Sequence, residues 1–242
     1  MSANVTALWR YPVSSMTGER LDVAPVDASG VVGDRIWGVI DRTSDRIASP
    51  GREKHFIKVP HGYARLTSSG DVEISAQGQR WAATDDEAVF GELSRLFGFP
   101  PQLKPFVPAD ADGFKARYDR APIHLLTTAA LRSLRQDLPG SVIDERRFRP
   151  NIVVDWPDEA KPIPEHDWIG REIRVGEVTL RGREPCGRCG FITIEQEGLP
   201  LDVEVLRTVV RRYERHFGIY CDVVSPGRIG LGDAVTVADI GA

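Results

Sequence analysis

Long apolar runs are missing from this chain of 242 residues. A helix that spans a bilayer needs roughly 18 or more consecutive apolar residues, and no segment comes near that length. The first residues, MSANVTALWRYPV, also lack the basic head and apolar stretch of a secretory signal. We therefore expect a cytoplasmic protein that has no membrane partner.

Cysteine is scarce, and no dense tract of lysine is present. Three cysteines cannot build a disulfide framework, so in a reducing cytoplasm Cys186 and Cys189 are interpreted as metal ligands or reactive thiols. The net charge of −4 argues against non-specific binding to nucleic acid. A small-molecule substrate is expected instead, and a small anion would need only a few well-placed arginines.

The first part of the chain reads mostly as strands. They are predicted at residues 5–13, 36–41 and 55–59, with a hairpin at 64–75. Thr84 and Glu87 have the spacing of a capping box, which predicts a helix whose apolar face continues to Phe97. Residues 100–114 are rich in Pro, Ala and Asp and are interpreted as a connector.

The second part mixes helices and strands. It is predicted to hold a helix at 131–138, a strand at 151–156, a hairpin at 172–181, a strand at 191–195, a helix capped by Asp202 that continues through Phe217, and a closing strand within 225–237. Many short strands with three helices predict an α+β fold. We expect a β-barrel-like core of mostly antiparallel strands with helices packed outside, divided into units at 1–114 and 115–242.

The motif EPCGRCGF holds Cys186 and Cys189 in a C-x-x-C, between two predicted strands. A loop held by strands can direct a sulfur atom at a ligand. The neighbouring Arg183 and Arg188 are expected to lower the thiol pKa and so favour the thiolate, which is the form that binds metals or attacks.

Three other interpretations of this motif stay open. A zinc site could use Cys186 and Cys189 with His216 and Cys221, although the ligand order is irregular. A thioredoxin-like redox pair would need a helix after the motif, where a strand is predicted. The two cysteines could also be small buried thiols without a chemical role.

Two further segments carry polar residues next to predicted strands. In RRFRPN, Arg149 and Asn151 flank Pro150, and in an extended segment both would face one ligand. Arginine offers a rigid fork for phosphate, and asparagine offers both a donor and an acceptor. In VVGDRIW, Gly33 permits a turn before Asp34 and Arg35. Taken alone, either segment could equally be an ordinary polar turn.

In their order along the chain these motifs resemble the MOSC family, named for the C-terminal domain of molybdenum-cofactor sulfurases. The family includes bacterial N-hydroxylated-base reductases and the mitochondrial amidoxime-reducing component. The matching motifs are YPVSS at 11–15, Gly33-Asp34-Arg35, DRAPIHLLT at 119–127, RFRPN at 147–151, Trp168-Ile169-Gly170, PCGRC at 185–189, LPLDVEVLRT at 199–208 and PGRIGLGD at 226–233.

The resemblance implies a molybdenum cofactor (molybdenum with molybdopterin), without pyridoxal phosphate, and a β-rich N-terminal unit ahead of a catalytic MOSC unit. It implies Cys189 as the metal ligand and Asp119 as a candidate proton relay. The remaining implied cofactor-binding residues are Ser14, Ser15, Arg35, Arg120, Ala121, Arg149, Asn151, Cys186 and Arg188. Ser14 stands where relatives often have Lys, and Arg120 is expected to supply that charge. Residues 49–58 depart from the family pattern.

By this resemblance the protein is expected to reduce N–O bonds, as in N-hydroxylated bases or amidoximes. No iron–sulfur or flavin motif occurs in the chain, so a separate electron donor of the ferredoxin or flavin-reductase type is expected. Two alternatives remain. The first is a sulfur carrier or transferase with a persulfide on Cys189, and the second is a cofactor- or zinc-binding module without catalysis.

Overall fold

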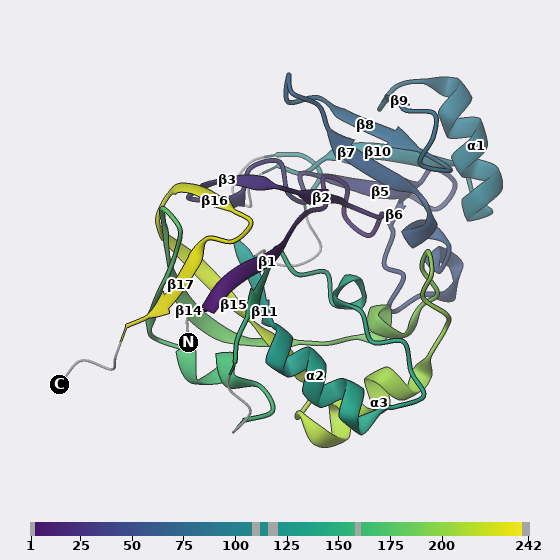
Figure 1. Ribbon diagram of the computed structural model, residues 1–242. Helices are drawn as coiled ribbons and strands as arrows, with labels where there is room; N and C mark the ends of the chain where they lie inside the picture. Colours follow the sequence, from purple (N-terminus) through teal and green to yellow (C-terminus); the bar gives the residue numbers. More distant parts are fainter. Residues whose placement is uncertain (1–2, 108–111, 116–120, 158–160, 239–242) are drawn as a thin grey trace.

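The computed structural model describes residues 3–107, 112–115, 121–157 and 161–238. Its centre is a closed barrel of seven strands (Figure 1). These strands are β1 (Ala3–Arg10), β12 (Ile152–Asp155), β11 (Ile123–Thr127), β15 (His216–Ser225), β14 (Val178–Gly187), β13 (Glu172–Val175) and β17 (Ala234–Val237). Pairing of β1 with both β12 and β17 closes the ring, and β2 (Glu19–Leu21) continues beside β1.

The barrel is antiparallel except at one pair, because β11 and β12 run parallel. Its interior is filled by aliphatic side chains that alternate along the strands, such as Leu125, Ile173 and Ile219. Such alternation is what a strand with one buried face requires. The predicted α+β class with a barrel-like core of mostly antiparallel strands is therefore confirmed.

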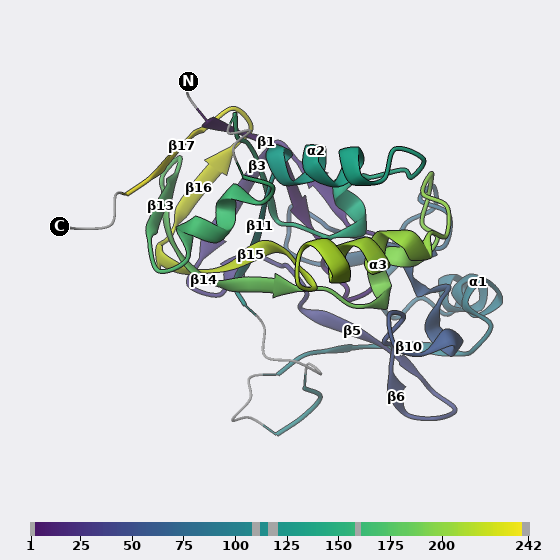
Figure 2. The same ribbon diagram turned by 90° about the horizontal axis from the view of Figure 1, so that it is seen from below.

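Two helices cover one side of the barrel. They are α2 (Thr128–Asp137) and α3 (Val203–Arg212), which lie side by side in both views (Figures 1 and 2). Leu131, Leu134, Val205 and Val209 bury their apolar faces in a second core cluster. The Asp202 carboxylate accepts a hydrogen bond from the Glu204 N–H at 2.9 Å and caps α3, as predicted.

The first part of the chain also forms three small sheets. They are β3 (Val23–Asp27) with β4 (Gly30–Val31) and β16 (Gly227–Gly230); β5 (Trp37–Asp41) with β6 (Arg46–Ile47) and β10 (Pro101–Pro105); and β7 (Tyr63–Leu66) with β8 (Val72–Ser75) and β9 (Ala82–Ala83). Helix α1 (Glu87–Phe97) packs on the second and third of these sheets and buries Val89, Leu93 and Phe97 in a third cluster. The hairpins predicted at 64–75 and 172–181 are both confirmed.

Short 3₁₀ turns connect these elements. They are η1 (Lys54–Phe56), η2 (Val59–His61), η3 (Glu145–Arg147), η4 (Pro164–Trp168) and η5 (Gly190–Thr193). No helix in the described ranges has the length and apolar character needed to cross a membrane.

Two predicted strands are wrong, because 3₁₀ turns occupy those positions. At 55–59, Phe56 and Val59 are buried, and their spacing of three fits a tight turn rather than an alternating strand. At 191–195, the adjacent residues Phe191 and Ile192 are both buried, which a strand with one buried face would not allow. The C-x-x-C motif therefore lies at the end of β14 and is followed by η5.

Three other boundaries differ from the predictions. Asp86 rather than Thr84 caps α1, since its carboxylate accepts from the N–H groups of Ala88 and Val89. Part of the predicted connector forms β10, which pairs with β5 at the edge of its sheet, where proline at the strand ends is tolerated. Helix α3 ends at Arg212, and Phe217 belongs to the long strand β15.

Candidate functional site

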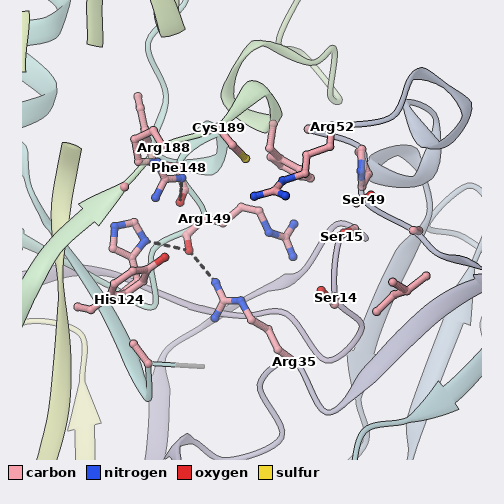
Figure 3. A pocket seen from close by; sticks show the side chains of 18 of the residues that line it. Ser14, Ser15, Arg35, Ser49, Arg52, His124, Phe148, Arg149, Arg188 and Cys189 are labelled. Carbon is pink, nitrogen blue, oxygen red and sulfur yellow. Dashed lines mark hydrogen bonds between the residues drawn. The ribbon is translucent and has the colours of Figure 1, made fainter. Parts of the chain in front are cut away.

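A cavity of about 290 Å³ is lined by residues of the barrel and of the N-terminal sheets (Figure 3). Of the predicted site residues, Ser14, Ser15, Arg35, Ala121, Arg149, Asn151, Arg188 and Cys189 line it. Cys186 is fully buried in β14, three residues before Cys189. Asp119 and Arg120 lie outside the described residues. Eight predicted residues from distant parts of the sequence thus meet at one cavity.

Arg35 is the centre of a hydrogen-bond network at the base of the cavity. It pairs with Asp34 through Nη1, and its Nη2 donates to the carbonyl oxygen of Arg149 at 2.9 Å (Figure 3). Asp34 in turn accepts from the backbone N–H of Tyr11 at 2.7 Å. Burial opposes the charge of Arg35, but the Asp34 carboxylate together with Tyr11 and Tyr220 outweighs burial and raises the pKa of Arg35. The guanidinium is therefore held in place with its charge intact.

The side chain of Asn151 is fully buried and forms hydrogen bonds with three neighbouring residues. Its Oδ1 accepts from Arg35 Nη1 at 3.2 Å and from the backbone N–H of His124 at 3.1 Å. Its Nδ2 donates to the carbonyl of Trp9 at 3.3 Å. Both ends of the amide are thus occupied by protein groups that join the ends of β1, β11 and β12.

Arg149 extends between two aromatic rings toward the cavity. Its guanidinium carbon lies 4.0 Å from the ring centre of Tyr11 and 5.2 Å from that of Phe191. Nη1 donates to the carbonyl of Met16 at 2.7 Å, whereas Nη2 is shielded from solvent and has no hydrogen-bond partner among the residues that the structure describes. Burial, with repulsion from nearby arginines, lowers the pKa of Arg149 to about 10. An anion beside Nη2 would satisfy this group.

Backbone strain is concentrated around this cavity. Ser15, Arg35 and Arg149 have φ angles of 72°, 50° and 54°, in the left-handed region that non-glycine residues rarely adopt. The extended geometry predicted for residues 149–151 is therefore wrong at Arg149, although both side chains do line the cavity. Each such residue costs about 1–3 kcal/mol, and such strain clusters at functional sites.

Cys189 presents its sulfur to the cavity and is half-buried (Figure 3). It directly precedes η5, and the loop that contains Gly51 packs against it. A Cβ atom placed on Gly51 would lie 2.9 Å from Cys189 Sγ and 2.6 Å from the backbone nitrogen of Phe191. Only a residue without a side chain fits there, so this loop fixes the sulfur from outside the barrel.

Charged and polar neighbours make the buried Cys186 thiol acidic. Burial raises the pKa of a thiol, but Arg188, His124 and hydrogen bonds from His124 and Tyr220 outweigh burial and lower the pKa of Cys186 to about 6. Arg188 Nη1 lies 2.8 Å from Cys186 Sγ, and Nη2 donates to the carbonyl of Phe148 at 2.7 Å. Arg183 instead pairs on the surface with Glu184 and Asp222.

The zinc interpretation finds no support in this geometry. Within the described ranges, no three His, Cys, Asp or Glu side chains gather closely enough to hold a metal ion. Cys221 is buried in the barrel interior, and all three cysteines are free thiols.

The residues present suit a bound group that is anionic and carries a thiophilic metal. Arg149 Nη2 and Arg188 Nε are buried and unpartnered within the described residues, so two donors are available beside the cavity. The Cys189 sulfur, which faces the cavity, is the type of soft ligand that a thiophilic metal prefers.

Four polar side chains that line the cavity were not predicted from the sequence. His124 and Tyr220 lie on β11 and β15, and Ser49 and Arg52 lie on the loop before η1. His124 is part of the DRAPIHLLT motif, and its place within that motif was the sequence signal that could have identified it as a site residue. Tyr220 carried none, because the strand that holds it was not predicted.

Comparison with known protein families gives two matches. The MOSC domain matches residues 112–236, and the MOSC N-terminal beta barrel domain matches residues 2–86. The chain belongs to the MOSC family. The resemblance found in the sequence motifs is thereby confirmed, while the boundary at residue 114 stays a prediction.

Several curated proteins are similar to this MOSC protein. Mitochondrial amidoxime-reducing component 1 of Danio rerio is 35% identical over 109 residues, covering 43% of this chain and 32% of the relative. Mitochondrial amidoxime reducing component 2 of Bos taurus is 24% identical, covering 96% of this chain and 82% of the relative. Molybdenum cofactor sulfurase of Drosophila grimshawi is 30% identical, covering 94% of this chain and 34% of the relative.

The match to the Danio rerio protein spans less than a third of that protein's own length. Among solved structures, the YUAD protein from Bacillus subtilis has a TM-score of 0.51 with 15% identity, covering 98% of this chain and 96% of that protein. That likeness concerns the fold alone. These relatives are named for the molybdenum cofactor or for amidoxime reduction, and they do not distinguish a reductase from a sulfur transferase.

Proposed function

We propose that this MOSC protein is a molybdenum-cofactor-dependent reductase of N–O bonds, acting on N-hydroxylated bases or amidoximes. The overall reaction consumes two electrons and two protons, breaks the N–O bond, and releases the reduced nitrogen compound and water. A separate protein of the ferredoxin or flavin-reductase type delivers the electrons. The observation that carries the proposal is the half-exposed Cys189 thiol in a cavity where a buried Arg149 nitrogen has no partner within the described part of the chain.

The chain's own residues would hold the cofactor and position the substrate. Cys189 would bind the metal through its thiolate. Arg149 would hold anionic oxygen through Nη2, with Arg35 and Asn151 fixing the surrounding backbone. When bound, the molybdenum cofactor would supply the two-electron exchange, and the protein contributes binding, orientation and electrostatics.

Further residues are proposed for the same task from their sequence positions. Ser14, Ser15 and Ala121 line the cavity and would contact the cofactor. Asp119 is proposed as a proton relay and Arg120 as a further cation for the cofactor phosphate. Cys186 lies behind the cavity, and we propose that it orients Arg188 through their 2.8 Å contact.

The test is elemental analysis of protein produced in cells supplied with molybdate. Wild-type protein should hold close to one molybdenum per chain, and Cys189→Ala should lose it. Cys186→Ala should keep most of the metal. Metal-free wild-type protein would contradict the proposed cofactor, and equal loss in both variants would contradict Cys189 as the ligand.

A sulfur carrier or transferase is the second candidate. It is favoured by the lowered pKa of the Cys186 thiol, about 6, which makes this residue a good resolving thiolate for a persulfide on Cys189. Mass spectrometry of the purified protein separates the two functions. An added sulfur on Cys189 without molybdenum would favour transfer, and molybdenum without added sulfur would favour reduction.

A further inference from the structure

Arg147 is a fully buried arginine whose side chain donates hydrogen bonds to backbone carbonyl groups. Its Nε donates to Val142 and its Nη2 to Pro200, both at 2.8 Å. Nη1 lies 3.3 Å from the carbonyl oxygen of Ile192 and 3.5 Å from that of Ile194. Arg147 itself belongs to η3. One side chain thus joins η3 to η5 and to the segment that follows η5.

The guanidinium group suits this position because of its shape. Arginine carries five N–H donors in a rigid plane and can serve several carbonyl groups at once, whereas lysine has a single ammonium group on a flexible stem. Burial lowers the pKa of Arg147, although the charges of Asp202 and Asp144 oppose that effect. A buried charge is costly unless hydrogen bonds compensate for it, and here backbone carbonyl groups supply them.

The turn that Arg147 holds carries the Cys189 sulfur. Cys189 directly precedes η5, and its carbonyl oxygen accepts from the Ile192 N–H at 3.3 Å. The carbonyl of the same Ile192 residue faces Arg147 Nη1. A short chain of hydrogen bonds therefore connects the guanidinium to the backbone of the proposed metal ligand.

The two residues after Arg147 contact the same part of the chain. The Phe148 carbonyl accepts from Arg188 Nη2 at 2.7 Å. The Arg149 guanidinium carbon lies 5.2 Å from the ring centre of Phe191. Three consecutive residues, 147–149, are thus connected to the segment on either side of the cysteine. The proposed anion-binding arginine and the proposed metal ligand lie on two segments that these contacts tie together.

We propose that Arg147 is a positioning residue that fixes the separation between the Cys189 sulfur and the anion-binding group of Arg149. This inference rests on the proposed reductase function. A cofactor held at two points binds tightly only when the protein keeps those points at the matching separation. Because Arg147 is fully buried, it acts through the backbone of η5 rather than on the ligand itself.

The experiment measures how readily the turn opens in metal-free protein. Arg147→Lys keeps the charge but loses the planar fork. Hydrogen exchange at the Ile192 and Ile194 N–H groups should become about 10-fold faster, because losing one hydrogen bond to a charged donor corresponds to about that factor. Alkylation of Cys189 by iodoacetamide should become faster as well. The other two cysteines are fully buried and should not react in the native protein.

Ile173→Val is the matched control. Ile173 is fully buried in β13 and belongs to the cluster in the barrel interior, apart from η3 and η5. Urea is added until the control and Arg147→Lys have the same free energy of unfolding. Exchange and alkylation at the turn of the control should then stay at wild-type rates. In a second measurement on protein loaded in molybdate-supplied cells, Arg147→Lys should lose molybdenum during dialysis about 10-fold faster than the control.

The outcomes separate this inference from the proposed function. Equal exchange and alkylation rates in Arg147→Lys and the control overturn the inference, since Arg147 would then contribute only to overall stability. Faster exchange with wild-type retention of molybdenum also overturns it, since the separation would not matter for the metal. If wild-type protein holds no molybdenum, the proposed cofactor is wrong, and faster exchange in Arg147→Lys alone still supports positioning of the Cys189 sulfur.

A measurement on wild-type protein covers the case in which Arg147→Lys does not fold. If Arg147 fixes the turn, the Ile192 and Ile194 N–H groups should exchange as slowly as those of the barrel strands. Exchange as fast as in an exposed loop overturns the inference.

Discussion

Gly51 is the position where a single added carbon should disturb the proposed metal site most. An alanine Cβ would lie 2.6 Å from Phe191 N, whereas ordinary contacts begin at 3.4 Å, so the two segments must separate by about 0.8 Å. Overpacking of this kind costs about 1–3 kcal/mol. The lower entropy of the unfolded alanine chain offsets about 0.4–1 kcal/mol. We expect Gly51→Ala to reduce the free energy of unfolding by about 1–2 kcal/mol.

The same substitution should displace the sulfur. The Cβ would lie 2.9 Å from Cys189 Sγ, which is about 0.5 Å short of ordinary contact. A metal site tolerates only about 0.5 Å of misplacement, so the molybdenum content should fall. Urea unfolding of the metal-free protein measures the loss of stability. Elemental analysis of protein from molybdate-supplied cells measures the fall in molybdenum content.

Gly91→Ala provides the control. Gly91 lies inside α1 with nothing within 4 Å of the added carbon, so alanine should stabilise the protein by about 0.5–1 kcal/mol and leave the metal content unchanged. If Gly51→Ala matches wild-type protein in both stability and molybdenum, the close packing of this loop on Cys189 does not exist in solution.

Three further predictions concern buried or capping groups. Burial raises the pKa of the Glu165 carboxyl to about 7, so its folded form favours the proton and wild-type stability should fall by about 3 kcal/mol as pH rises from 4.5 through 7. Glu165→Gln should lose that dependence in urea unfolding followed across pH, and an unchanged slope would refute the assignment. Asp86→Ala should destabilise the protein by about 1 kcal/mol, whereas Thr84→Ala should have little effect, which thermal unfolding can compare. In metal-free protein, thiolate absorbance near 240 nm should rise with a midpoint near pH 6 and vanish in Cys186→Ser, because the pKa of Cys186 is about 6.

Much of the fold could be predicted because alternation and turn residues are local signals. The hairpin around Gly176 shows this well, since Ile173, Val175, Val178 and Leu180 alternate on either side of a turn. The misassigned stretches were short and apolar, and there the same residues fit either a strand or a 3₁₀ turn. Burial by distant segments decided between them, as with Phe56, which packs against Phe99.

Site residues that belong to a sequence motif could be predicted. Those that only tertiary packing brings to the cavity were missed. Arg35, Arg149 and Cys189 come from three recognisable motifs, and the structure brings them to one cavity. Arg52 and Gly51 lie in a segment that departs from the family pattern. The effect of Gly51 depends on its contact with Cys189 and with Phe191 of η5, which local sequence does not encode. The different surroundings of the two cysteines also arise from tertiary structure, because the Arg188 side chain contacts Cys186.

Closure of the barrel by β1 has a consequence for how this protein folds. Asn4 pairs with both Asp155 and Ala234, so the first strand emerges from the ribosome long before either neighbour exists. Contacts of such large sequence separation form slowly, and an unpaired strand edge is prone to aggregation meanwhile. The N-terminal sheets with α1 can pack earlier, because apart from strand β16 their pairings lie within residues 23–105. The barrel that forms one wall of the cavity can therefore close only after its last strand, β17, has been synthesised.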